Sequence, residues 1–339
     1  MATLGPAVGA LLVTMLAACS ATPVGTQPSG TQPAATSPSQ AASSPSQPTT
    51  ASLPATPSQP ATASQPGTGS PPGTGSQPAT GSGPATGSRP ATGSGPAWFV
   101  TRAALTSLIA DQGAKARLLG AQIYEILRPG QKPVAGVPAR PVVTFASATT
   151  LKQAVAAGQI PPGTYGVMYD PEAWSFTPVA EQRDPVAAAA SAASVAHAHG
   201  LRFIVAPALN LTTVLAPDSS APRWRRFLDL DLVAQLARVA DIVELQAQSL
   251  ERDATTYRTF VHEATAQATA ANSRVVAIAG LSTNPPGITV SGANLVAAIA
   301  ATRTLVTGYW LNIPGLGAQC PTCGPANPAV AISTLRQLS

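Results

Sequence analysis

From about residue 140 onward, short apolar runs alternate with longer stretches whose apolar residues recur at helical spacing. The short runs are apolar nearly throughout, which is typical of parallel strands covered on both faces. Six such runs predict strands at 141–147, 165–170, 201–209, 241–248, 274–282 and 306–315. The helical patterns cover 149–158, 184–200, 229–240, 253–272, 291–304 and 327–338. Asp184 and Pro185 are typical of a helix start, and Gly200 of a helix end.

Alternating strands and helices at this spacing predict a parallel α/β sheet with crossover helices. The sheet is either a closed barrel or an open doubly wound sheet, and a full barrel needs eight strands. AWFVT (97–101) and LTTVL (211–215) could supply two more. We predict one (β/α) TIM-barrel-like domain over 97–339, a length that suits such a barrel.

The segment before this domain has a different composition. Residues 20–96 consist almost wholly of Ser, Thr, Pro, Gly, Gln and Ala, and Arg89 is the one charged residue among them. So little apolar surface cannot offset the entropy of ordering the chain. We therefore predict that residues 19–96 form a disordered low-complexity tether.

The first residues form an apolar run, AVGALLVTMLAA (7–18), which ends in LAAC with small residues before Cys19. This ending resembles the lipobox of bacterial lipoproteins. The resemblance implies a signal peptide over 1–18, a lipid on the Cys19 thiol, and a membrane-anchored location on the extracytoplasmic face. The alternative is an ordinary signal peptide with an incidental cysteine. Signal peptides usually open with Lys or Arg, and no such residue precedes Cys19.

Two further cysteines, Cys320 and Cys323, stand in the motif AQCPTCGP. A CxxC pair can be half of a zinc site, a redox pair or a short structural disulfide. Zinc requires about four ligands, and the chain has no second cysteine pair, so we predict no metal. The position between Pro314 and Pro328 favours a structural loop disulfide over a redox pair.

The formal net charge is +5, and the clearest basic cluster is Arg223, Arg225 and Arg226 around Trp224. No nucleic-acid motif accompanies it, so anionic wall polymer or lipid headgroups are better expected partners. The sequence has no nucleophile elbow, phosphate-binding loop or dinucleotide fingerprint. We therefore expect no cofactor, no nucleic-acid partner and a monomer.

Each predicted strand becomes polar at its C-terminal end, the edge at which barrels carry their active sites. Because side chains alternate along a strand, Met168, Asp170 and Glu172 share one face. Glu244, Gln246 and Gln248 share a face of the fourth strand in the same way. The candidate site residues at these ends are Asp170, Glu172, Trp174, Asn210, Gln246, Gln248, Asn284, Trp310 and Asn312.

Asp170-Pro171-Glu172 has two interpretations. The sequence is typical of a helix start, with Asp170 as the cap. However, Thr177-Pro178 would end such a helix within two turns, and an aromatic loop with two carboxylates suits a site. Glu244 lies in mid-strand, which predicts a buried structural partner for an Arg or a Gln.

The end of this strand resembles the D-x-x-D-x-D-x-E pattern of chitinase-like barrel glycosidases. Asp170 and Glu172 match its last two acids, and Tyr165 and Met168 stand where the first two would be. The resemblance implies that Glu172 is the general acid and that Asp170 positions the N-acetyl group of the substrate. It also implies that Trp310 forms the floor of the sugar site.

The sequence therefore predicts a surface-anchored lipoprotein whose glycosidase-like barrel acts on cell-wall or extracellular polysaccharide. The alternative is a non-catalytic carbohydrate-binding or wall-binding lipoprotein that uses the same end of the barrel. A structural surface protein without a ligand is the third interpretation.

Overall fold

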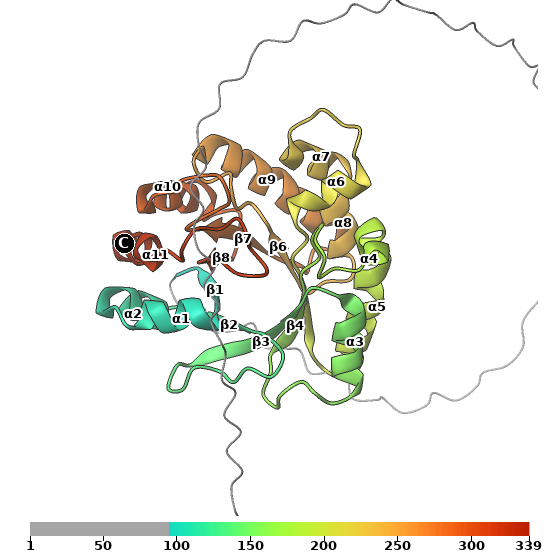
Figure 1. Ribbon diagram of the computed structural model, residues 1–339, viewed down its shortest axis with the longest axis horizontal. Helices are drawn as coiled ribbons and strands as arrows, with labels where there is room; N and C mark the ends of the chain where they lie inside the picture. Colours follow the sequence, from blue (N-terminus) through green and yellow to red (C-terminus); the bar gives the residue numbers. More distant parts are fainter. Residues whose placement is uncertain (1–94, 339) are drawn as a thin grey trace, which may run out of the picture. The chain divides into compact units, whose positions relative to one another are not determined.

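The computed structural model describes residues 95–338, which form eight parallel strands closed into a barrel (Figure 1). Each strand pairs with the next in sequence, and β8 closes on β1, where Trp310 pairs with Phe99. The predicted TIM-barrel-like fold is confirmed. The strands are β1 Ala97–Thr101, β2 Ile123–Leu127, β3 Ala139–Phe145, β4 Gly166–Tyr169, β5 Arg202–Val205, β6 Ile242–Leu245, β7 Val276–Ser282 and β8 Gly308–Asn312.

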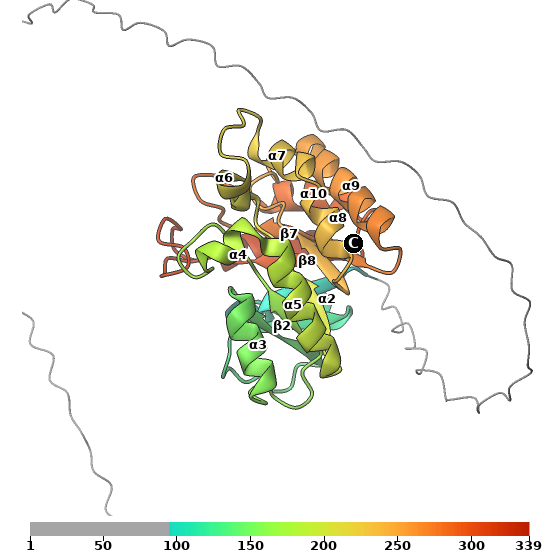
Figure 2. The same cartoon turned by 90° about the vertical axis from the view of Figure 1, so that its right-hand side faces the viewer.

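Helices surround the barrel on its outside (Figures 1 and 2). They are α1 Arg102–Ile109, α2 Gln112–Leu119, α3 Ala148–Ala156, α4 Val179–Arg183, α5 Pro185–Ala198, the 3-10 helix η1 Leu209–Leu211, α6 Thr212–Leu215, α7 Arg223–Asp229, α8 Leu232–Ala237, α9 Ala254–Ala271, α10 Gly292–Thr302 and α11 Pro328–Gln337. Asp184 caps α5 as predicted, since its carboxylate accepts from Ala187 N at 2.9 Å. In this part of the chain no helix is long and apolar enough to cross a membrane.

Six of the eight strands correspond to the six predicted runs, and the other two are β1 and β2. AWFVT forms β1, whereas the prediction of a strand at LTTVL is wrong, because those residues form the end of η1 and α6. β5 ends two residues before Pro207, which has no N–H for a ladder. The missing strand is β2, where buried Glu125 interrupts the apolar run. Both Glu125 oxygens accept from Val134 N, at 3.0 and 3.1 Å.

The barrel has an interior core and an outer layer packed against the helices. Phe99 and Tyr124 stack inside the barrel with ring centroids 4.2 Å apart. The interior members are Phe99, Tyr124, Ile126, Val142, Met168, Ile204, Ala206, Ile242, Ile278 and Trp310. Inward-facing residues therefore follow the period of two in each strand, so residues just beyond a strand end can continue the interior face.

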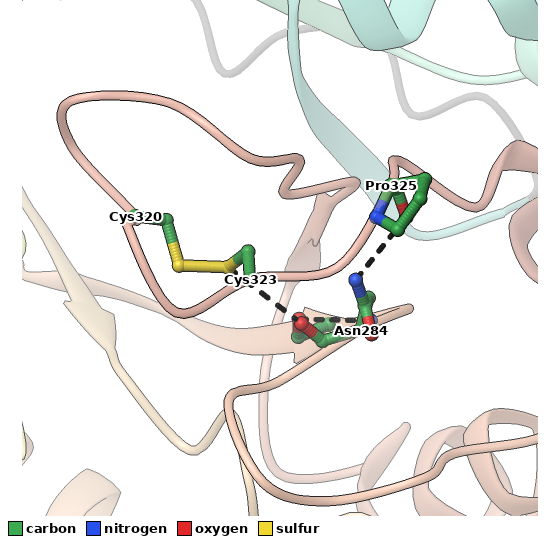
Figure 3. The surroundings of a disulfide bond; sticks show 5 residues. Asn284, Cys320, Cys323 and Pro325 are labelled. Carbon is green, nitrogen blue, oxygen red and sulfur yellow. Dashed lines mark hydrogen bonds between the residues drawn. A yellow bond between two sulfur atoms is a disulfide. The ribbon is translucent and has the colours of Figure 1, made fainter. Parts of the chain in front are cut away.

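The loop after β8 carries a disulfide between Cys320 and Cys323 (Figure 3). Asn284, just after β7, donates from Nδ2 to the carbonyl of Pro325 at 3.3 Å. Its own carbonyl oxygen lies 4.0 Å from Cys323 Sγ. The disulfide loop is thus attached to the end of β7. Among residues 95–338, no group of three His, Cys, Asp or Glu side chains could hold a metal ion.

The signal peptide, the lipidated Cys19 and nearly all of the tether predicted from the sequence lie outside the described residues.

Candidate active site

The mouth of the barrel, meaning its end at the C-terminal ends of the strands, receives Asp170 and Glu172 from β4. Met168 lies in the interior core, and Asp170 and Glu172 continue its parity. No helix begins at Asp170, because residues 170–178 form a loop and α4 begins only at Val179. The helix-cap interpretation of Asp170-Pro171-Glu172 is therefore wrong.

Thr177 holds this loop in place. Its Oγ1 accepts from Glu172 N at 3.2 Å and from Trp174 Nε1 at 2.9 Å. The same hydroxyl donates to the carbonyl of Ala146 at 2.9 Å, which attaches the loop to the end of β3. The sequence predicted Thr177 only as a helix stop, and its role depends on this contact with a distant segment.

Two amide side chains fix the two carboxylates. Gln246 donates from Nε2 to Asp170 Oδ1 and to the carbonyl of Ala206, both at 2.8 Å. Asn210 donates from Nδ2 to Glu172 Oε2 at 3.2 Å and accepts from Ala173 N at 2.9 Å. Four of the predicted site residues are thus joined by hydrogen bonds, although they come from the ends of three different strands.

Glu244 on β6 also faces the interior, and it is fully buried. Neither of its carboxylate oxygens has a hydrogen-bond partner, nor does Oε1 of Gln248. The prediction that Glu244 pairs with an Arg or a Gln is therefore wrong. Gly280 on β7 leaves room for Glu244 and Gln248, because their side chains occupy the space that a Cβ of Gly280 would take.

The electrostatics of these carboxyls follow from burial and from one another. Burial raises the pKa of Glu172 to about 7, although the hydrogen bond from Asn210 lowers it in part. Burial and the charge of Glu172 raise the pKa of Asp170 well above its usual range. Burial and the charges of Asp170 and Glu172 do the same for Glu244. Burial therefore favours the protonated form of all three carboxyls, and Glu172 is only partly protonated near neutral pH.

The free energy of unfolding should fall as the pH rises from about 5 to about 8. The folded-state pKa of Glu172 and of Glu251 is about 7, against 4.5 for a free glutamate. The folded protein therefore binds more protons than the unfolded chain between these values. We expect a loss of about 2–5 kcal/mol by chemical denaturation at the two pH values. Glu172→Gln should flatten the dependence, and stability that rises over this range would contradict the assignment.

Replacement of Gly280 by alanine should destabilise the fold by about 1–3 kcal/mol through overpacking. The new Cβ would lie 2.4 Å from Glu244 Oε1 and 2.6 Å from the amide of Gln248. Urea denaturation would measure the change. The double variant with Glu244→Ala should recover part of the loss because it removes the nearer atom. Equal losses in the single and double variants would count against this contact.

The other predicted residues are placed differently. Trp310 is 7% exposed within the interior core, and its Nε1 has no hydrogen-bond partner. Trp174 is partly exposed in the loop after β4 and meets Phe176 edge to face, with centroids 5.1 Å apart. Asn284 is used in holding the disulfide loop. Asn312 is half-buried at the end of β8, where its carbonyl accepts from Thr283 N at 3.0 Å.

Glu251, in the loop after β6, is a further buried acid that the sequence did not single out. Its Oε1 accepts from Ser282 N at 2.7 Å, and its Oε2 has no hydrogen-bond partner. Burial raises its pKa to about 7. No sequence motif marks it, because it lies in a polar loop between two regular elements.

No family model and no curated protein matches the chain. Among solved structures, it is similar to the catalytic domain of a family GH18 chitinase from the fern Peteris ryukyuensis, with 12% identity, coverage of 71% of this chain and 98% of the other, and a TM-score of 0.42. For a chitinase from Chromobacterium violaceum the identity is 12%, the coverage is 72% of this chain and 100% of the other, and the TM-score is 0.39. For triosephosphate isomerase from Bartonella henselae these values are 13%, 64%, 91% and 0.36. The likeness concerns the barrel fold, which these proteins use for different chemistry.

Proposed function

We propose that the chain is a surface-anchored lipoprotein whose glycosidase-like barrel cleaves cell-wall or extracellular polysaccharide. The observation that carries this proposal is the state of Glu172. It lies partly exposed at the mouth, is held by Asn210, and has a pKa raised to about 7 by burial. Glycoside cleavage requires such a carboxylic acid, which keeps its proton near neutral pH and then releases it to the leaving group.

In the proposed reaction, the Glu172 proton moves to the glycosidic oxygen while the bond between that oxygen and the sugar C1 breaks. The electron pair of this bond stays on the departing oxygen, and positive charge develops at C1. The Asp170 carboxylate, fixed by Gln246, stabilises that charge. Burial favours the protonated form of Asp170, whereas the hydrogen bond from Gln246, the neutral state of protonated Glu172 and the positive charge at C1 favour its carboxylate. Water then attacks C1 and returns a proton to the Glu172 carboxylate.

The test is to incubate the full chain with a panel of wall and extracellular glycans and to measure new reducing ends. Release of reducing ends from at least one glycan is the expected result. Absence of both cleavage and binding across the panel would refute the proposal. Trp174 and Phe176 supply exposed aromatic faces for sugar rings, and Phe176 is 43% exposed.

A non-catalytic carbohydrate-binding protein is the second candidate function. In the part of the chain that the structure describes, the additional acids near the mouth, Glu244 and Glu251, are both buried. A water-accessible carboxylate opposite Glu172, as many glycosidases use, is not among them. Binding of a glycan without release of reducing ends would favour this function.

The anchor and the partners belong to the same proposal. Lipid on Cys19 would tether the chain to the extracytoplasmic face of the membrane, and a polysaccharide rather than a nucleic acid would be the partner of a monomeric domain. The sequence LAAC supports the anchor. Cells that express the chain should incorporate labelled fatty acid into it, and Cys19→Ser should abolish that label. Equal labelling of both forms would contradict lipidation at Cys19.

A further inference from the structure

Three carboxyls converge at the mouth without a positive partner. We call Asp170, Glu172 and Glu244 the mouth acids. The described residues contain five ion pairs, and none of them includes a mouth acid. Asp170 and Glu172 accept side-chain hydrogen bonds from neutral amides, and Glu244 accepts none. This part of the barrel therefore collects negative charge, or the protons that neutralise it.

A shortage of basic residues does not explain this arrangement, because the chain has 19 Lys and Arg against 14 Asp and Glu. Several basic side chains elsewhere have partners of their own. Arg140 lies over the rings of Tyr124 and Tyr165, near the starts of their strands. Arg202 pairs with Asp241, and Arg128 donates to Gln319 of the disulfide loop. The mouth acids thus lack a cation although the protein has many.

The burial of Glu244 costs free energy, because its side chain is fully buried and both of its carboxyl oxygens lack a hydrogen-bond partner. A buried carboxyl without a partner loses its hydration and receives nothing in return. Gly280 provides the space in which it sits. A structural role would be better served by a partner within the barrel, so a positive group on a ligand is the natural complement.

We propose that the mouth takes a cationic amino sugar, a hexosamine unit with a free ammonium group, in preference to a neutral or N-acetylated sugar. This inference rests on the proposed function and names the substrate class for the same site. The ammonium would lie against Asp170, with the carboxyl of Glu244 beneath it in the low-dielectric interior.

Binding should have a distinctive signature. A cation beside the mouth acids favours their charged forms, so it lowers their pKa values and releases protons. A neutral sugar of the same size has no such effect. Calorimetry of the full chain in buffers of different ionisation enthalpy would measure the protons released, using tetrasaccharides of glucosamine, N-acetylglucosamine and glucose.

We expect the glucosamine tetramer to bind at least about tenfold more tightly than the other two, with net proton release and weakening in salt. In Glu244→Gln this preference should fall severalfold. Glu251→Gln is the matched control, because it also replaces a buried carboxyl near the mouth but should keep the preference.

The outcomes separate this inference from the proposed function. If the neutral or N-acetylated tetramer binds equally well or better, the preference for a cation is overturned and the carbohydrate function stands. Tight glucosamine binding without proton release, or an equal loss in both variants, would also overturn the inference. If none of the three tetramers binds and no panel glycan is cleaved, both proposals fail.

Discussion

Replacement of Glu172 by glutamine is expected to lower the turnover of any glycan that the chain cleaves by about 10²–10⁴-fold, while the Kd changes little. Glutamine retains the size of the side chain and can still accept from Asn210, but it has no acidic proton for the leaving oxygen. The comparison requires kcat from reducing-end release and Kd from calorimetry on the same glycan. A change confined to Kd would instead make Glu172 a binding residue.

The dependence of activity on pH is a second test of the Glu172 carboxyl. Glu172 must be protonated to act as the acid, so kcat/KM, which reports the free protein, should fall as the pH rises through about 7, the raised pKa of its carboxyl. In Asn210→Ala the hydrogen bond that lowers this pKa is lost, so the fall should move to higher pH. Glu263→Gln is the matched control, because Glu263 pairs with Arg225 on the outer helices. Glu263→Gln should leave kcat/KM and its pH profile unchanged, and a kcat/KM profile without a fall near pH 7 would exclude Glu172 as the acid.

The period of two along a strand explains what the sequence could predict about the candidate site. Met168, Asp170 and Glu172 were expected on one face, and the interior position of Met168 with the bond from Gln246 to Asp170 agrees with that expectation. The prediction was local, since parity requires only the strand itself. The barrel could be predicted for a similar reason, because strand-helix alternation is a local pattern repeated along the chain.

Contacts between strands could not be predicted in this way. The surroundings of Glu244 depend on Gly280 in the neighbouring strand, and nothing in the residues around Glu244 reveals that space. Trp310 is similar, since the sequence predicted its place near the C-terminal end of a strand but not its burial among the interior residues. The strand β2 was missed because Glu125 breaks its apolar run, and the partner of Glu125, Val134 N, lies beyond the end of the strand. The local sequence pattern therefore predicts which face of a strand a side chain lies on. Its contact partners depend on how neighbouring strands are aligned in the folded barrel.

Replacement of Glu181 by alanine is expected to destabilise the fold by about 3–5 kcal/mol, the largest stability effect among the single substitutions considered for this barrel. Glu181 in α4 is buried and attaches that helix to the start of α3. Its Oε2 accepts from Ala148 N at 2.8 Å and from the Tyr169 hydroxyl at 3.2 Å. Its Oε1 accepts from Thr149 N at 3.1 Å, from Thr149 Oγ1 at 2.9 Å and from the Ser147 hydroxyl at 3.0 Å. Alanine would leave these donors without the carboxylate that accepts from them.

Asp184→Ala provides the comparison, because Asp184 caps α5 with one exposed hydrogen bond, so its loss should cost only about 1 kcal/mol.

The stability of the protein at low pH is an independent test of the role of Glu181. Burial raises the pKa of its carboxyl, but the hydrogen bonds from Ala148 and Thr149 outweigh burial and hold the pKa below 4.5. The stability that Glu181 contributes is therefore present above pH 4.5 and is lost as the pH falls through the lowered pKa. Urea denaturation at neutral pH and at about pH 3 should show a gap between wild type and Glu181→Ala that narrows in acid. A gap no larger than that of Asp184→Ala would mean that the donors at the start of α3 find water or another acceptor when the carboxylate is removed.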